Sequence, residues 1–265
     1  MISIAGTPVG PNQLQGTWAM AGYARQILSA MIANSSNYSY PNLSALQFEV
    51  NLRNSIMQTA LELGESGASF ADFPAARCNE AYWMLTSQGG FLLRPSVPPA
   101  AAIRDIYQNG WLYAFECATA IIIIYYKAVL NVLPDPLFNS LFSDLYLYSW
   151  EFDKDLGVRT VRTSQFVPGD VLYFDNPDVN PATIEWQGVN VVDLSNGQYF
   201  GHGIGVRNAA EIIRILNENR RWGASRSAYL MSQATNPDYH YLFRVSGQNR
   251  RIIGQIGSHR VQVIS

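Results

Sequence analysis

The chain has 265 residues, enough for one large domain or two small ones and enough to bury a core without disulfides or metals. With 48% hydrophobic and only 14% charged residues, it does not have the composition of a disordered protein. The formal net charge of -2 gives no electrostatic reason to expect nucleic acid or an anionic membrane as a partner, so we expect proteins or small molecules.

The N-terminal third is predicted to be helical. Helical spacing of apolar residues covers Gln15–Asn34 and Leu43–Leu63, and Asn42 or Pro41 would begin the second helix and Gly64 would end it. The chain order that follows, a central helix and then a sheet, favours an α+β fold over a parallel-sheet fold.

The middle of the chain is predicted to hold a hairpin and a long helix. Alternation across Tyr82–Leu93 predicts a hairpin that turns at Gln88-Gly89-Gly90. Pro95–Pro99 forces an extended connector, after which Ala100 begins a helix. The run Trp111–Val132 contains no Gly or Pro and is predicted to be one helix entering the core.

The C-terminal half is predicted to form a small antiparallel sheet and short helices. A short helix or strand is expected over Asn139–Trp150, helices over Asn208–Asn217 and Ser225–Ser232, and a tail or edge hairpin over Gln248–Ser265. The predicted strands are Asp170–Phe174, Thr183–Trp186, Asn190–Leu194 and Gln198–Gly203.

Two cysteines, Cys78 and Cys117, are too few for a disulfide framework and fit a reducing compartment. Residues 1–10 lack a basic segment followed by an apolar one, so we expect no secretory signal and a cytoplasmic protein. The apolar run Ala118–Tyr126 is too short to cross a bilayer, and we expect no membrane partner.

Cys117 is the candidate nucleophile, because a thiol near the start of a helix can have its pKa lowered by the helix dipole. On position alone, packing in the core is the commoner role for such a cysteine. Neighbouring Glu116 could act as its base if buried, although an acidic residue at a helix start more often stabilises the dipole.

His202, in the segment Tyr199–Gly203, is the first histidine to consider as a base, with a hydrogen-bonded core histidine as the equally common alternative. His240 and His259 look structural. The sequence has neither a closely spaced pair of cysteines nor an HExxH motif, so neither a metal nor a cofactor is expected.

Several sequence blocks between Gln47 and Arg244 stand out together. The most extensive block holds Ala102 to Ile106, Asn109-Gly110 and Tyr113 to Ile121, which includes Glu116 and Cys117. The others are Gly67 to Ala71, Gly169 to Phe174 with Asn176-Pro177, Trp186 with Gly188 and Asn190-Val191, Tyr199 to Gly203, and Ser227 to Thr235. By these blocks and their order, this part of the chain resembles the bacterial spore-coat protein-glutamine γ-glutamyltransferases.

The resemblance implies a papain-like core of the NlpC/P60 type, with a central helix packed on a small antiparallel sheet and extra N-terminal helices. It implies one transglutaminase-like domain, residues 1–265, with an N-terminal helical region (1–99), a catalytic core (100–245) and a tail (246–265). It also implies calcium-independent crosslinking of glutamine to lysine side chains of protein partners, spore-coat proteins among them, and a location in the cytoplasm or at the spore surface.

Carried onto this chain, the resemblance makes Cys117 the nucleophile that forms a thioester and Glu116 an auxiliary carboxylate. Phe70 and Trp186 would be aromatic walls of a tunnel to the cysteine, Val189 would also line that tunnel, and His202 would give polar support.

One departure concerns the partner carboxylate of the family, which aligns with Val189. Valine cannot accept a proton, so Glu116 or Glu185 would have to substitute. If residues 183–186 formed a strand, Glu185 and Val189 would share a face about 13 Å apart. Either substitute should lower the catalytic rate, because a well-positioned base contributes about 10²- to 10⁴-fold to that rate.

Two other interpretations stay open. An amidohydrolase or peptidase with the same core would use Cys117 with His202 and pass the acyl group to water. A catalytically impaired coat protein would keep the fold only to bind partners, an interpretation that Val189 favours.

Overall fold

The computed structural model describes residues 1–10, 14, 22–247, 252–256 and 259–263. Its α-helices are α2 (Ala24–Ala33), α3 (Leu43–Glu65), α4 (Pro99–Gln108), α5 (Cys117–Val132), α6 (Asp135–Leu141), α7 (Ala209–Glu218) and α8 (Tyr239–Val245). Short 3₁₀ helices are η1 (Phe73–Ala75), η2 (Gly110–Leu112), η3 (Lys154–Leu156) and η4 (Pro181–Gln187).

The strands form several separate sheets. The main antiparallel sheet has the order β13 (Gly205–Asn208), β12 (Gln198–Gly201), β11 (Gly188–Asp193), β10 (Val171–Asp175), β15 (Gln233–Asn236) and β9 (Arg159–Arg162), and β14 (Tyr229–Leu230) also pairs with β10. Smaller sheets are β2 (Thr7–Val9), β1 (Ile2–Ile4) and β3 (Tyr38–Tyr40); β5 (Trp83–Leu85), β6 (Phe91–Leu93) and β8 (Tyr146–Leu147); β4 (Ser69–Phe70) with β7 (Ala114–Phe115); and β16 (Ile252–Ile256) with β17 (His259–Val263).

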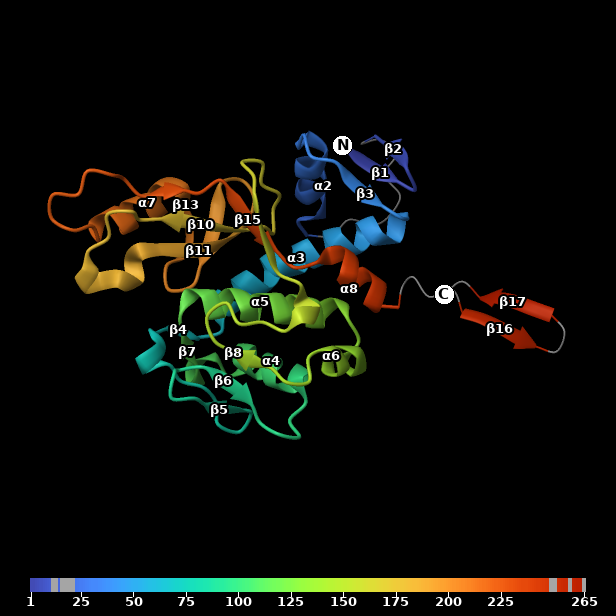
Figure 1. Ribbon diagram of the computed structural model, residues 1–265, viewed down its shortest axis with the longest axis horizontal. Coiled ribbons are helices and arrows are strands. Elements are labelled where there is room, and N and C mark those ends of the chain that lie inside the picture. Colours follow the sequence, from blue (N-terminus) through green and yellow to red (C-terminus); the bar gives the residue numbers. More distant parts are fainter. Residues whose placement is uncertain (11–13, 15–21, 248–251, 257–258, 264–265) are drawn as a thin grey trace.

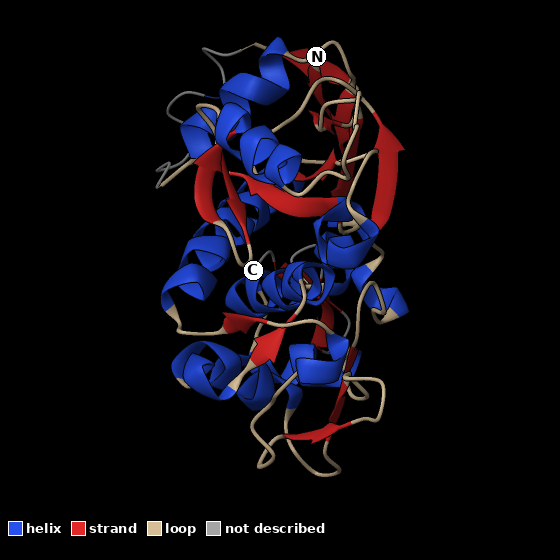
Figure 2. Ribbon diagram, turned by 90° about the vertical axis from the view of Figure 1, so that its left-hand side faces the viewer, coloured by secondary structure: helices blue, strands red, loops and turns tan. Residues whose placement is uncertain are grey.

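Helix α5 occupies the centre of the molecule (Figures 1 and 2). The main sheet contacts it through β11, the β5–β6–β8 sheet contacts it through β8, and the helices α4 and α3 also pack on it. All four isoleucines from Ile121 to Ile124 are buried. A helix that is apolar on every side is stable only where other elements cover all of its faces. The predicted α+β arrangement, with a central helix against an antiparallel sheet, is confirmed.

Helix α3 confirms the predicted second helix almost to the residue. The Asn42 side chain accepts a hydrogen bond from the Ala45 N–H and so caps its start. The helix continues through Gly64, where the prediction ended it, to Glu65. A Cβ at Gly64 would lie 2.8 Å from the Phe200 ring, so this glycine makes room for packing and does not end the helix.

The predicted helix over residues 111–132 is wrong in its first part. The chain first forms η2 and then β7, which pairs in parallel with β4 so that Phe70 lies opposite Phe115. Gly110 packs so closely on Ser66 that an added Cβ would lie 2.3 Å from its carbonyl oxygen. This long-range pairing keeps residues 114–115 extended, and α5 therefore begins only at Cys117.

Three of the four predicted strands in the C-terminal half are confirmed as β10, β11 and β12. The predicted strand Thr183–Trp186 is wrong, because these residues lie in η4, which the Asn180 side chain caps by accepting from the Ala182 N–H. The predicted helix Ser225–Ser232 is also wrong and contains β14.

Other predicted elements are present with shifted ends. The hairpin turning at residues 88–90 is β5–β6, and the predicted helix Asn208–Asn217 is α7, capped by Asn208. Residues 139–150 include the end of α6 and β8. Of the predicted helix Gln15–Asn34 the structure confirms α2, and residues 15–21 lie outside the described part. The C-terminal segment contains the β16–β17 hairpin, and residues 248–251, 257–258 and 264–265 lie outside the described part of the chain.

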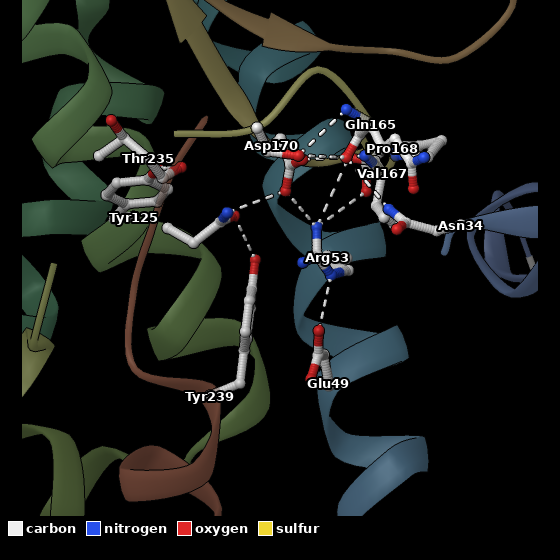
Figure 3. Close-up of polar contacts among 12 residues, drawn as sticks. Asn34, Glu49, Arg53, Tyr125, Gln165, Val167, Pro168, Asp170, Thr235 and Tyr239 are labelled. Atoms are coloured by element: carbon white, nitrogen blue, oxygen red, sulfur yellow. Dashed lines mark hydrogen bonds and ion pairs between the residues drawn. The ribbon is translucent and has the colours of Figure 1, made fainter. Parts of the chain in front are cut away.

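A buried ionic cluster joins α3 to the main sheet (Figure 3). Arg53 donates from Nε to Glu49 at 2.9 Å and from Nη1 to Asp170 at 2.7 Å. Asn236 donates to the same Asp170 oxygen at 2.9 Å, and the Tyr239 ring lies 4.7 Å from the guanidinium carbon. Because removing one partner would leave a buried charge unpaired, the cluster fixes the position of β10 relative to α3.

Candidate active site

Cys117 is the first residue of α5, and Glu116 caps that helix. The Glu116 carboxylate accepts hydrogen bonds from the N–H groups of Ala118 and Thr119, each at 2.6 Å, and from the Thr119 hydroxyl at 2.8 Å. Three donors thus occupy its oxygens. The structure places Glu116 in the helix-stabilising role, and the Cys117 thiol also lies within hydrogen-bonding reach of its carboxylate.

The surroundings of Cys117 favour the neutral thiol. Burial, and then the negative charge of Glu116, raise the pKa of Cys117 to about 11, against an opposing effect of the Asn190 amides. The helix start is therefore not accompanied by the lowered pKa that the sequence suggested, because burial and the Glu116 charge outweigh the Asn190 hydrogen bonds. A nucleophile in this position needs a base to remove its proton.

Asn190 is a candidate site residue that sequence reasoning missed. It lies on β11, is only 7% exposed, and its Nδ2 donates to the Cys117 sulfur at 3.6 Å. The available signal was a polar residue inside the apolar run Val189–Val192, since a buried amide in a strand requires a partner. Here that partner is the sulfur.

Two cavities meet at Cys117. The larger has a volume of about 740 Å³ and is lined by polar and apolar residues, among them Glu116, Tyr173 and Asn190. The smaller, about 70 Å³, is mainly apolar. Cys117, Glu185 and Gly188 line both cavities, so a group could reach the sulfur through either of them.

The three residues expected to form a tunnel all line the smaller cavity. Phe70 is 40% exposed, Trp186 is half-buried, and Val189 is 5% exposed. The Phe70 ring packs on Gly203, which adopts φ +88° and where an added Cβ would lie 3.0 Å from Phe70. Glycine is thus required at this wall of the cavity.

Glu185 is brought to the site by the helix that replaced the predicted strand. Because residues 181–187 coil as η4, the alternation that would have held Glu185 about 13 Å from position 189 does not apply. Its side chain is exposed to solvent and lines both of the cavities that Cys117 also lines. Val189 packs in an apolar cluster with Phe174 and Val191.

His202 lines the smaller cavity but is bonded away from the thiol. Its Nε2 lies 3.1 Å from the Ser69 carbonyl oxygen, and its ring stacks on Phe115 at 4.7 Å. Burial lowers the pKa of His202 to about 4, although the Ser69 and Phe115 carbonyls oppose this. A neutral ring that donates to a backbone carbonyl is suited to structural support of the Phe70–Phe115 strand pair.

Other features bear less on the site. Cys78 and Cys117 are both free, and burial raises the pKa of Cys78 to about 11. Among the described residues no group of three or more histidine, cysteine or acidic side chains is arranged to hold a metal. None of the helices in that part of the chain is long and apolar enough to cross a membrane.

Comparison with known proteins identifies the family. The profile of the family described as protein-glutamine gamma-glutamyltransferase matches residues 1–246. The chain belongs to the protein-glutamine γ-glutamyltransferase family. It is therefore an acyltransferase, and the resemblance noted in its sequence is confirmed.

Individual relatives agree with this assignment. Protein-glutamine gamma-glutamyltransferases of Bacillus cereus strains 03BB102 and B4264 are each 47% identical over 238 residues, covering 90% of this chain and 86% of the relative. A solved transglutaminase from Geobacillus stearothermophilus, without its C-terminal extension, is 48% identical, with a TM-score of 0.75 over 78% of this chain and 99% of that one. The structural match supports the papain-like core expected for this γ-glutamyltransferase.

Proposed function

We propose that this γ-glutamyltransferase joins protein glutamine and lysine side chains through a thioester on Cys117. The sulfur attacks the γ-carbonyl carbon of a glutamine, the C–N bond breaks, and ammonia leaves with the thiol proton. A lysine amine then attacks the thioester and loses a proton, and the isopeptide forms as the thiol is restored. The observation that carries this proposal is Cys117 at the start of α5, lining both cavities.

Glu185 is the proton acceptor in this proposal. Val189 has no acidic group and His202 is bonded to Ser69. Glu116 lies within hydrogen-bonding reach of the thiol, but its oxygens also accept three hydrogen bonds from the start of α5, which commits it to capping the helix. Glu185 is the remaining carboxylate among the residues that line the two cavities. Its side chain is exposed and stands in for a carboxylate that the family resemblance puts at position 189, so the enzyme should be slow.

Two features of the site would assist the reaction. The Asn190 amide that now contacts the sulfur can donate to the oxyanion that forms beside it. The smaller cavity, walled by Phe70, Trp186 and Val189, would keep water from the thioester and so favour the amine.

Substrate range and cellular role rest on the family resemblance. By that resemblance the reaction needs no calcium, the substrates are glutamine- and lysine-bearing proteins of the spore coat, and the protein acts in the cytoplasm or at the spore surface. The single-domain organisation, with regions 1–99, 100–245 and 246–265, belongs to the same proposal.

Two observations favour competing functions. The 740 Å³ cavity and the exposed Glu185 would admit water as the acceptor, which would give glutamine deamidation. Val189 favours a scaffold that has lost its base and only binds coat proteins.

The test is incorporation of a fluorescent primary amine into a glutamine-rich protein with a calcium chelator present. Cys117→Ala should abolish incorporation, and Glu185→Gln should lower kcat by about 10²-fold. Glu116→Gln is the matched control, because its amide oxygen can still cap α5. If Glu185→Gln retains full kcat, Glu185 is not the base. Ammonia release without incorporation would favour hydrolysis, and inactivity of the parent chain would favour the scaffold.

A further inference from the structure

The chain contains almost no amine of the kind that its own reaction consumes. Of its 18 lysine and arginine residues only two are lysines, Lys127 and Lys154. A guanidinium keeps its proton and is not an acyl acceptor, so arginine supplies positive charge without being a substrate. The enzyme can therefore be joined to another protein as an acceptor through very few groups.

Lys127 is held in place on α5. Its ammonium donates to Asn131 at 2.7 Å, pairs with Glu62 at 3.6 Å, and lies 5.2 Å from the centre of the Tyr107 ring. Its side chain is only 14% exposed. Entry into the cavity of another molecule would break all three contacts. The Met1 amine is likewise engaged, with the carbonyl oxygens of Asn34 and Ser36.

Lys154 differs in exposure and in position. It is exposed, and within the described part of the chain its ammonium has no hydrogen bond or ion pair. Residues on both sides of it, Phe152 and Val158, line the larger cavity beside Cys117. Lys154 therefore projects from a segment that forms the wall of the active-site cavity.

The backbone that carries Lys154 is fixed. The Asp153 side chain caps η3 by accepting from the Asp155 N–H at 2.8 Å, and the Tyr241 hydroxyl donates to the Asp155 carboxylate. A rigid turn presents its central side chain at low entropic cost, which favours capture by a partner.

We propose that Lys154 is the acceptor through which a second copy of the enzyme attaches this chain to its glutamine substrate. The inference rests on the proposed thioester. The Nζ of Lys154 attacks the γ-glutamyl thioester on Cys117 of the other copy, the C–S bond breaks, a proton leaves the amine, and an isopeptide remains on Lys154. Each copy would thus become bound to the crosslinked material through one lysine at its cavity wall.

The test uses one chain as target and another as enzyme. The target carries Cys117→Ala and retains both lysines, the enzyme carries Lys154→Arg, and the donor is a fluorescent peptide with one glutamine and no free amine. Attachment at Lys154 blocks tryptic cleavage there, so the donor should appear on the fragment 128–159 of the target. A target that also carries Lys154→Arg should stay unlabelled, and one that carries Lys127→Arg should label fully.

Other results would overturn the proposal. Label on Lys127 or on the Met1 amine would assign the acceptor elsewhere. Label on the unmutated chain, which holds both Cys117 and Lys154, but not on the Cys117→Ala target would exclude a second copy. No label, from an enzyme that incorporates a free fluorescent amine into a glutamine-rich protein, would refute Lys154 alone. Failure of that free-amine reaction as well would refute the proposed function and this inference together.

Discussion

Alkylation of Cys117 should be slow at neutral pH and should accelerate steeply as the pH rises. With a thiol pKa of about 11, roughly one molecule in 3,000 carries the thiolate at about pH 7.5. An unperturbed cysteine, with a pKa of about 8.5, carries it in roughly one molecule in ten, so iodoacetamide should react about 300-fold more slowly with Cys117. The rate should rise about tenfold per pH unit up to about pH 10.

The assay is iodoacetamide labelling followed by mass spectrometry, in a Cys78→Ser background because Cys78 also has a raised pKa. Glu116→Gln removes the like charge and retains a capping oxygen, so it should increase the rate at fixed pH. A rate that levels off below about pH 8.5, the pKa of an unperturbed thiol, would refute the conclusion that burial sets this pKa. A rate unaffected by Glu116→Gln would refute the contribution of that charge.

Four further expectations concern stability and catalysis. Burial raises the pKa of Asp193 to about 6, so the stability of the fold falls as pH rises from about 4 through 6. Asp193→Asn should therefore stabilise it by about 1–2 kcal/mol at neutral pH and little at about pH 4 in urea unfolding; equal gains would contradict this. Val189→Glu should raise kcat by about 10²-fold or more, because it restores a carboxylate at this position. It should lower the free energy of unfolding, because the carboxylate enters an apolar cluster, and an unchanged kcat would show that the valine is not what makes the enzyme slow. Asn190→Ala should lower kcat by about 10²-fold at similar KM, and a change confined to KM would exclude an oxyanion role. The pH–rate profile should have no inflection between 6 and 7, because burial lowers the pKa of His202 to about 4; an inflection there that His202→Asn removes would assign the base to His202.

Elements with strong local signals could be predicted from the sequence. The capping Asn42 and the long apolar period mark α3, the glycines at 89 and 90 mark the β5–β6 turn, and Asn208 marks the start of α7. In each case the determining contacts lie within a few residues of one another, so the pattern alone specifies them.

Elements fixed by distant contacts were missed. Nothing near Ala114 signals that β4 will pair with it, and without that pairing the sequence is a good helix. Residues 183–186 have strand-forming composition, but the Asn180 cap and Pro181 set a helical turn instead. This second error had a readable local cause, whereas the first did not.

The site shows the same division. Cys117 and Glu116 were found from their motif, whereas Asn190 and the raised thiol pKa depend on how deeply β11 and α5 bury the sulfur. Burial arises from the whole fold and has no local pattern. Glu185 was named from the sequence as a possible substitute base, but its place on the lining of the cavities depends on η4, which the predicted strand over residues 183–186 did not include.

The central claim is that Cys117 carries the acyl group, and the direct measurement is trapping of that intermediate. The enzyme is mixed with a glutaminyl peptide without any amine, quenched in acid, and its mass is determined intact and after digestion. We expect an adduct of the peptide mass less one ammonia on Cys117, which a primary amine discharges and which Cys117→Ala lacks. Amine incorporation without any such adduct, or an adduct on another residue, would contradict the account.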